Sequence, residues 1–445
     1  MDRVAALPVD TLNAMLAERR EELVTAFSFS GETLGTPYSG SGTLDAWRIL
    51  PGEPGDLLRL ALPIASGSVT AGEGGAIDLT GLDAVVMVAL RLLPGEEGLP
   101  PGGNPLHREE DELPAGEEAS RGERPGDLVF DLREAGRLGD DAVPGVVTPV
   151  ALTGPGRVLA ELSDLGRRAV LDGVAGPLAR HAAELSFVLA TVDLGARPAP
   201  RRSAFNYTRT TGRTDSGYLA VFGVMEDVDV SRLPLTLDPA LASGGEAVFA
   251  VSSRLFLTEM VLPGLPDALG GETSAATVAY DPASKSLRET RPFSIGSLVE
   301  GAIRYTPRVT SLSIGVVGGD LAVRVEGDCD LKAGISMTFW ATARSRMVFH
   351  RDRAAISFVP DGKVDSGYQA DIPVWFILGG PLAEGITQLV VSVISEDLAG
   401  RLGSGAGPAG LGRWASRPVR WGAARAMTVE HAALDGCFHI SGRPA

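Results

Sequence analysis

The chain has 445 residues, 44% of them hydrophobic and 22% charged, so it has enough apolar material for two or three folded domains and is not globally disordered. Its 56 acidic residues exceed its 40 basic residues, and the resulting formal charge of −16 excludes general binding to nucleic acid. Two cysteines cannot form a disulfide framework or a four-thiolate zinc site, and the five dispersed histidines show no metal-ligand spacing. We therefore expect no metal and no cofactor.

The first predicted element is an amphipathic helix near the N-terminus. Val9, Leu12, Leu16 and Leu23 recur at helical intervals and are accompanied by a polar face. No basic region followed by an apolar core precedes this helix, so a secretory signal is not expected. The sequence predicts a cytoplasmic protein and leaves export without a signal open.

Three further helices are predicted at residues 157–185, 251–262 and 381–398 from apolar residues at helical spacing. In the first of these, Gly173 and the Gly176-Pro177 pair predict a break, because both residue types disfavour a helix interior. In the last, the apolar face is too broad for a helix that is exposed to solvent on one side.

Between these helices, long tracts alternate apolar and polar residues, which is typical of strands whose sheet has one covered face. Residues 335–343 alternate most regularly, and segments 312–316 and 321–325 flank a diglycine turn. The pattern predicts an α+β fold with few helices and long antiparallel meanders.

One segment, residues 94–127, has almost no apolar residue and contains ten acidic residues against three arginines. Such a composition is typical of a solvated, mobile insertion, here placed between two strands. A docking segment for a basic partner is the alternative interpretation.

The sequence contains no phosphate-binding loop of the GxxxxGK type and no serine nucleophile elbow. Cys437 and His439 would share one strand face, but such a pair is more typical of packing than of catalysis. We therefore assign no catalytic residue.

Arginine and tryptophan residues alternate near the C-terminus, a combination that suits a lipid headgroup and a bilayer interface. The alternative is that the tryptophans pack inward and the arginines extend over them. The longest apolar stretch, residues 373–394, is interrupted by Pro381 and Glu384, so membrane contact would be peripheral at most. The candidate membrane and headgroup residues are Arg413, Trp414, Arg417, Arg420 and Trp421.

Five segments carry a resemblance to a known family when they are read in order, namely Leu178–Leu194, Gly42–Trp47, Ser252–Phe256, Asp330–Thr338 and Trp421–Gly442. Together they resemble the tubular lipid-binding (TULIP) superfamily and, within it, the OrfX-type accessory proteins of clostridial neurotoxin gene clusters. The chain departs from this pattern at Phe205-Asn206-Tyr207, where the family tends to have a Trp-Leu-x-Pro element, and in its acidic insertion.

This resemblance implies an elongated fold in which strongly curved antiparallel sheets wrap long helices, arranged as two pseudo-repeated modules. We place these modules at residues 1–210 and 211–445. Such a fold would leave an apolar tube or groove for acyl chains or another hydrophobic ligand. The candidate lining residues are Ile335, Met337, Phe339, Leu382, Ile386, Leu389 and Val393.

The function expected from these features is non-enzymatic binding of a lipid or another hydrophobic small molecule, at a membrane surface or away from one. Burial of an acyl chain supplies about 0.8 kcal/mol per methylene without directional contacts, so no polar signature is required. One alternative is a structural or interaction subunit of a toxin or secreted complex, with a protein partner from the same gene cluster. Another is a cofactor-free, cyclase-like enzyme acting on a hydrophobic biosynthetic intermediate.

Overall fold

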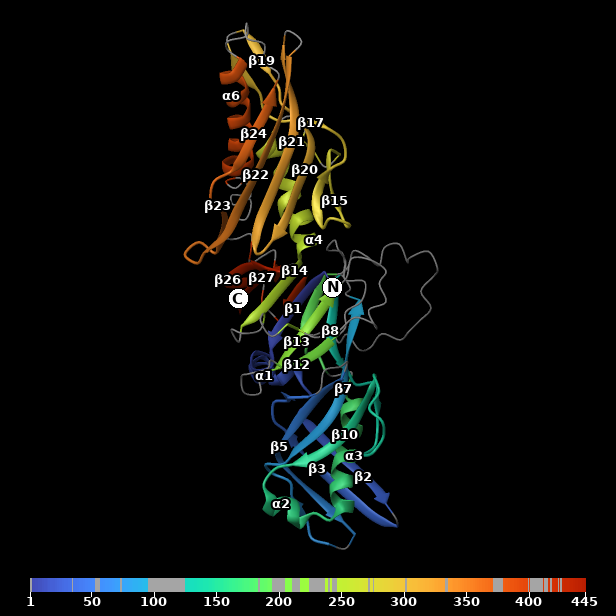
Figure 1. Cartoon of the computed structure of the whole chain (residues 1–445). Coiled ribbons are helices and arrows are strands. Elements are labelled where there is room, and N and C mark those ends of the chain that lie inside the picture. The colour runs from blue at the N-terminus through green and yellow to red at the C-terminus, as the bar shows by residue number, and fades with distance from the viewer. Residues whose placement is uncertain are drawn as a thin grey trace, which may run out of the picture.

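The computed structural model describes residues 2–33, 35–52, 57–72, 74–94, 125–182, 185–193, 205–209, 217–223, 237–238, 241, 246–270, 273–274, 276–300, 302–332, 335–370, 379–398, 400, 411, 415–416, 418–422, 424 and 426–445. Figure 1 shows an elongated molecule in which three sheets follow one another along the long axis. Both termini lie at the central sheet, so the chain leaves the middle of the molecule and returns to it.

The central sheet is organised around β1 (Arg3–Pro8), in which all six residues are buried. A strand that is apolar on both faces belongs inside a sheet, and β1 pairs on both sides in antiparallel register. The sheet has the order β12 (Phe205–Arg209), β13 (Gly217–Gly223), β1, β14 (Ala247–Ser252), β27 (Cys437–Pro444) and β26 (Met427–Asp435).

The lower sheet in Figure 1 combines N-terminal strands with one strand from near the C-terminus. Short strands pair at its sides, namely β4 (Arg48–Leu50), β6 (Ile77–Asp78), β9 (Glu134–Ala135) and β10 (Val146–Thr153). The main order is β2 (Ala26–Thr33), β3 (Thr36–Leu44), β5 (Leu57–Ala71), β7 (Asp83–Pro94), β8 (Pro125–Asp131), β11 (Ala190–Asp193) and β25 (Val419–Trp421).

The upper sheet contains the long alternating strands that the sequence predicted. Its order is β15 (Val278–Asp281), β16 (Ser286–Glu289), β20 (Arg308–Val317), β21 (Asp320–Lys332), β22 (Ile335–His350) and β23 (Ala355–Pro360). Attached to it are β17 (Phe293–Ser294) and β24 (Asp365–Ala370), and a separate hairpin consists of β18 (Leu298–Glu300) and β19 (Ile303–Tyr305). The predicted strand-dominated α+β class with antiparallel sheets is therefore confirmed.

The predicted helices are present, each with adjusted limits. The first is α1 (Val9–Glu18), followed by a 3₁₀ turn, η1 (Arg20–Glu22), and the second forms α2 (Gly156–Glu161) and α3 (Asp164–Arg180). The third runs as α4 (Ser253–Leu255), η6 (Phe256–Val261), η7 (Leu262–Gly264) and α5 (Leu265–Leu269), and the fourth as α6 (Gly379–Ser392) and η8 (Val393–Asp397). Both η6 and η8 are π-helical.

The predicted break at Gly173 and Gly176-Pro177 was wrong. α3 continues through all three residues to Arg180, because its apolar face is buried against the lower sheet and tertiary packing compensates for the weak helix formers. The actual break precedes α3, where the Ser163 hydroxyl accepts a hydrogen bond from the Gly166 backbone N–H at 3.1 Å and caps the helix.

The acidic insertion connects two paired strands, as expected. Its first residue, Pro94, ends β7, and Pro125 begins β8, which lies beside β7 in antiparallel register. Residues 95–124 between them lie outside the described part of the chain.

The two halves of the chain interlock. β25, from residues 419–421, pairs with β11 and so extends the lower sheet, while the central sheet takes strands from both 1–210 and 211–445. Residues 211–445 therefore add a strand to the lower sheet, and residues 1–210 add β1 and β12 to the central sheet.

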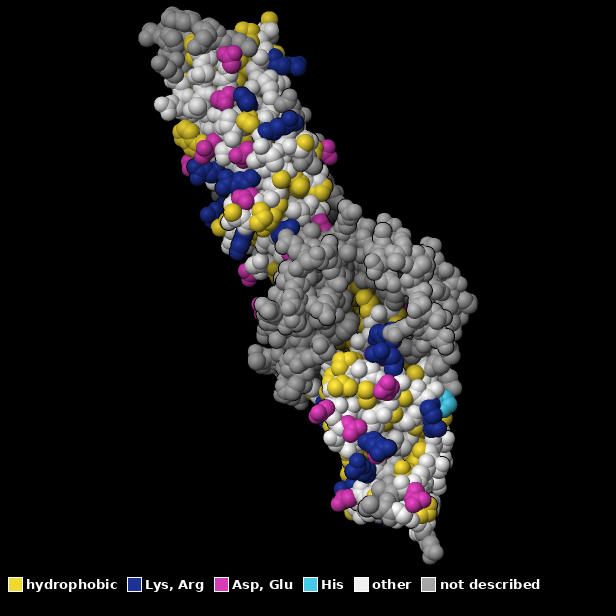
Figure 2. Space-filling view, turned by 90° about the vertical axis from the view of Figure 1, so that its right-hand side faces the viewer, with side chains coloured by type: hydrophobic (Ala, Val, Ile, Leu, Met, Phe, Trp, Pro, Cys, Tyr) yellow, Lys and Arg dark blue, Asp and Glu magenta, His cyan; other side chains and the backbone are white. Residues whose placement is uncertain are grey.

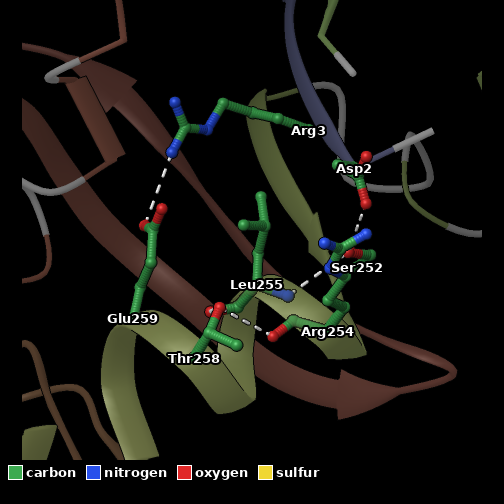
Figure 3. Close-up of polar contacts among 7 residues, drawn as sticks. All are labelled: Asp2, Arg3, Ser252, Arg254, Leu255, Thr258 and Glu259. Carbon is green, nitrogen blue, oxygen red and sulfur yellow. Dashed lines mark hydrogen bonds and ion pairs between the residues drawn. The ribbon is translucent and has the colours of Figure 1, made fainter. Parts of the chain in front are cut away.

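The junction between the central sheet and the upper helices is held by side chains from the N-terminus (Figure 3). The Ser252 hydroxyl donates to an Asp2 carboxylate oxygen at 3.1 Å and accepts from the Leu255 N–H at 3.4 Å, which caps α4. Arg3 Nη2 lies 3.5 Å from Glu259 Oε2 on η6. Strand β1 is thus tied directly to the first helix of the upper region.

Candidate ligand-binding site

The fold brings together the two sets of predicted lining residues. α6 packs against β22, β21 and β24 of the upper sheet, so the apolar face of the helix meets the apolar face of the strands. Buried hydroxyls on this helix are satisfied internally, since Thr387 Oγ1 donates to the Ala383 carbonyl at 2.9 Å.

The predicted lining residues are closely packed against their own chain. Six of the seven are buried, with exposures of 0–7%, and the seventh is half-buried. Their neighbours are other members of the main apolar core. Packing of this kind is what an ordinary core requires, so a ligand-lining role for these residues remains a prediction. They are Ile335, Met337, Phe339, Leu382, Ile386 and Val393, together with the half-buried Leu389.

The arginine and tryptophan segment is only partly described. Arg413, Trp414 and Arg417 lie outside the described residues. Arg420 is exposed on β25, whereas the neighbouring Trp421 is 5% exposed and sits opposite Ala190 of β11. The Trp421 ring therefore packs inward and is not presented to a bilayer.

Trp421 lines a hollow of about 710 Å³ between α1 and the central sheet. This volume lies within the range of roughly 300–1,000 Å³ that is common for small-molecule sites. One wall is the outer face of α1, and the other is formed by the start of β14 and the end of β27. The lining residues are Thr11, Ala14, Met15, Glu18, Arg19, Glu246, Ala247, Trp421, Ala424, Gly442, Arg443, Pro444 and Ala445.

The hollow has an apolar base and charged groups around it. Met15 reaches the turn after β25, where the space above Gly422 is taken by the Met15 methyl group and a side chain at position 422 would collide with it. Ala247 and Trp421 are both buried, whereas Glu18 is exposed. An amphipathic molecule matches such a lining, with its apolar part inside and its polar part at the rim.

Arg19 forms a fixed cationic corner of the hollow. Its guanidinium bonds the Glu22 carboxylate through two nitrogens, Nε at 2.7 Å and Nη2, and donates to the Val188 carbonyl at 3.3 Å. It also lies over the Phe187 ring, 4.6 Å from the centroid. These contacts hold the side chain in one position beside the hollow.

On the opposite wall, Glu246 belongs to a small acid–base network. Its Oε2 accepts a hydrogen bond from Ser441 Oγ at 2.9 Å, and the neighbouring Glu430 is paired with Arg443 at 3.1 Å. Burial raises the pKa of Glu246, and a hydrogen bond with Glu430 raises it further. This network places carboxylate, guanidinium and hydroxyl groups along the wall opposite α1.

The sequence did not indicate this hollow. Its residues come from positions 11–19, 246–247, 421–424 and 442–445, and only the folding of both chain ends into the central sheet brings them together. Trp421 alone was singled out, for a different role.

No metal or nucleophile centre is apparent in the part of the chain that the structure describes, where no group of three or more metal-ligating side chains occurs. Cys437 and His439 lie on the same strand, β27. Burial raises the pKa of the Cys437 thiol and lowers the pKa of His439, so each shift disfavours the charged form. These shifts oppose formation of a thiolate–imidazolium pair.

Two solved structures have the same fold as this chain. P47 from Clostridium botulinum A2 superposes with a TM-score of 0.76 at 17% identity, covering 99% of this chain and 97% of that protein. P47 of Clostridium botulinum E1 gives a TM-score of 0.77 at 15% identity, covering 100% of this chain and 99% of that one. The chain has the P47 fold.

The sequence comparison agrees over a shorter region. Residues 183–355 match the OrfX-like family model, described as protein OrfX2/OrfX3/P47. The match spans less than half of the chain and covers the part that leads from β11 through the central sheet into the upper sheet. No curated protein matches the chain in sequence. Among the described residues, no helix combines the length and apolar character needed to cross a bilayer.

Proposed function

We propose that the protein is a non-enzymatic binder of an amphipathic or hydrophobic ligand, such as a fatty acid or another lipid, and that the ligand occupies the hollow beside α1. The observation that carries this proposal is a 710 Å³ space with a buried tryptophan and alanine at its base and charged groups at its rim. Each buried methylene would contribute about 0.8 kcal/mol, so a long acyl chain binds without many polar contacts.

The rim chemistry supports a ligand with one polar end. Arg19 and Arg443 are each paired with a glutamate, and Glu246 accepts a hydrogen bond from Ser441, so charged and hydrogen-bonding groups are available there to contact a polar end. The resemblance to the TULIP superfamily, in which apolar tubes hold acyl chains, supports the same ligand class. Peripheral contact with a membrane is a further part of this proposal, with exposed Arg420 as the described residue that would contact headgroups.

The experiment uses protein that has been delipidated by denaturing extraction and refolding, with cis-parinaric acid as the fluorescent fatty-acid probe. We expect saturable binding by the intact chain. Ala14→Trp should weaken binding at least tenfold, because Ala14 lines the hollow and an indole would fill much of it. Ala17→Trp is the matched control, since Ala17 is exposed on the same helix and does not line the hollow.

Failure of the intact protein to bind the probe would overturn the proposal, and so would equal binding by the two tryptophan variants. Native mass spectrometry of protein purified from its own host provides an independent measurement. A lipid-sized mass increment that is lost in Ala14→Trp would support the proposal.

A second candidate function is a structural or interaction subunit of a multiprotein complex. The close packing of α6 against β22, with six of the seven predicted lining residues buried, favours this alternative for the upper region. A stoichiometric protein partner together with a lipid-free mass spectrum would support the subunit, and a bound lipid without a partner would support the carrier.

A further inference from the structure

An exposed tryptophan lies on the outer face of the upper sheet, far from the hollow. Trp340 is in the middle of β22, where Phe339 and Ala341 on either side point inward and are buried. Trp340 itself is 42% exposed. An indole is the largest apolar side chain, and one that is presented to solvent in a regular strand requires an explanation.

The strand beside Trp340 leaves room for the ring to lie flat. Gly367 of β24 is its direct partner across the sheet. A Cβ atom at position 367 would lie only 2.5 Å from Trp340 Cη2 and 2.9 Å from Cε2, two atoms of the benzene part of the indole. The ring therefore lies against the glycine backbone of β24, while 42% of the side chain remains exposed to solvent.

The strand registers place polar side chains on all sides of this ring. Glu326 of β21 is opposite Trp340 and is held by Arg324, whose Nε and Nη2 lie 3.0 and 2.6 Å from Oε1. Adjacent strands are about 4.8 Å apart, and alternate residues along one strand are about 7 Å apart. The neighbouring side chains therefore lie close enough to the indole to contact the edge of a sugar ring that is stacked on it. The neighbours on the same face are Arg324, Glu326, Asp328, Thr338, Thr342, Asp365 and Gln369.

The charges of the residues around Trp340 indicate which class of ligand this face can bind. Three carboxylates stand against one arginine in this ring of neighbours, so anionic lipid headgroups and nucleic acid would be repelled. A neutral partner with many hydroxyl groups matches the carboxylates, amide and hydroxyls, which together supply both acceptors and donors. Figure 2 shows acidic and basic side chains intermixed over the upper region on the face in view, so no broad basic surface is apparent there.

We propose that this face is a carbohydrate-binding site with Trp340 as its stacking platform. A pyranose ring has one face of C–H bonds, which are weakly positive and attracted to the negative face of an aromatic ring. Its hydroxyl groups project from the rim, where Asp328, Asp365 and Gln369 can accept or donate hydrogen bonds. A short, flat platform on a rigid sheet suits a neutral mono- or oligosaccharide.

The test is saturation-transfer difference NMR with the methyl β-glycosides of glucose, galactose, N-acetylglucosamine and N-acetylgalactosamine as probes. The intact protein should transfer magnetisation to the C–H protons of at least one glycoside. Trp340→Ala should reduce the affinity at least tenfold, and Trp340→Tyr should retain most of it, because an aromatic face is kept. Gly367→Val should also weaken binding, since it displaces the ring.

Val317→Ala is the matched control, since Val317 is 51% exposed in the same sheet and does not adjoin the platform. Thermal melting of each variant establishes that it is folded before its binding is compared. Absence of transfer to every glycoside would overturn the proposal, and so would unchanged binding by Trp340→Ala. Because the platform is distant from α1, failure here leaves the fatty-acid site unaffected, and Ala14→Trp should bind the glycosides as the intact chain does.

Discussion

The ring of Phe29, on β2, occupies the space directly above Gly173 of α3. A Cβ atom at position 173 would lie 2.5 and 2.6 Å from Phe29 Cδ1 and Cδ2, closer than real Cβ atoms approach any heavy atom. The contact places a helix backbone against an aromatic ring, and this explains why a glycine stands in the middle of a buried helix.

This contact predicts opposite effects for two alanine substitutions in α3. Gly173→Ala should lower the free energy of unfolding by about 1–3 kcal/mol, because the steric clash outweighs the gain in helix propensity. Gly176→Ala should raise it by about 0.5–1 kcal/mol, since nothing lies within 4 Å of a Cβ atom there. Urea denaturation followed by circular dichroism measures both, and equal effects of the two substitutions would contradict the contact.

The pair formed by Arg3 and Glu259 predicts an asymmetry between its partners. The Arg3 side chain is 8% exposed, so Glu259→Gln leaves a largely buried cation with a weaker partner and should destabilise by about 1–3 kcal/mol. Adding Arg3→Met to that variant should restore much of the loss, because a methionine of similar length needs no counter-ion. A double-mutant cycle in urea measures the coupling, and strictly additive losses would argue against it.

Trp47 should be sensitive even to a conservative change. It is fully buried, its Nε1–H donates to the Val24 carbonyl at 3.1 Å, and its ring lies 5.6 Å from that of Phe130. Trp47→Phe keeps an aromatic ring but leaves the Val24 carbonyl without this donor, which should cost about 1–3 kcal/mol. Denaturation in urea provides the value, and a neutral effect would mean that water or another group replaces the donor.

His439 predicts a loss of stability in acid. Burial lowers its pKa below the ordinary 6.5, and the ring of His431, 6.0 Å away, lowers it further. Just below pH 6.5, the unfolded chain therefore binds more protons than the folded chain does. The stability that the folded protein has with neutral His439 is complete above pH 6.5 and is lost as the pH falls toward the lowered pKa. His439→Gln should have a melting temperature that falls less across this window.

A second histidine variant serves as the control for this acid effect. Glu246 does not account for the loss of stability in acid, because its pKa is raised and its protonation favours the folded state as the pH falls. His431→Gln removes one cause of the His439 shift and should give a fall between those of the intact chain and His439→Gln. Identical pH profiles for all three proteins would contradict the role of His439.

The sequence predicted local elements well because their signals are local. The alternation along residues 335–343 became β22, and the spacing of Val9, Leu12 and Leu16 became the buried face of α1. The prediction failed at Gly173, where the effect of a glycine depended on Phe29, a residue 144 positions away (173 − 29). Local propensity does not contain such a contact.

For the candidate sites too, the sequence predicted the local features and did not predict the long-range contacts. The alternating residues of β22 identified which face is inward, but the alternation alone did not show that Trp340 rests on Gly367, because that depends on the register between β22 and β24. The hollow beside α1 depends on pairing between β14 and β27, whose partners Val248 and Ser441 are 193 residues apart (441 − 248). Both sites follow from strand pairing, which a single sequence leaves undetermined.

The position of both chain ends in one sheet also sets an order of events during synthesis. β1 is synthesised well before β14 and β27, which complete its side of the central sheet and lie more than 200 residues further along the chain. Until then the nascent chain carries an unpaired apolar strand edge, open to association with other chains. Slow translation between β1 and β27 would prolong that exposure. Coexpressed chaperones that cover the exposed edge should therefore increase the soluble yield.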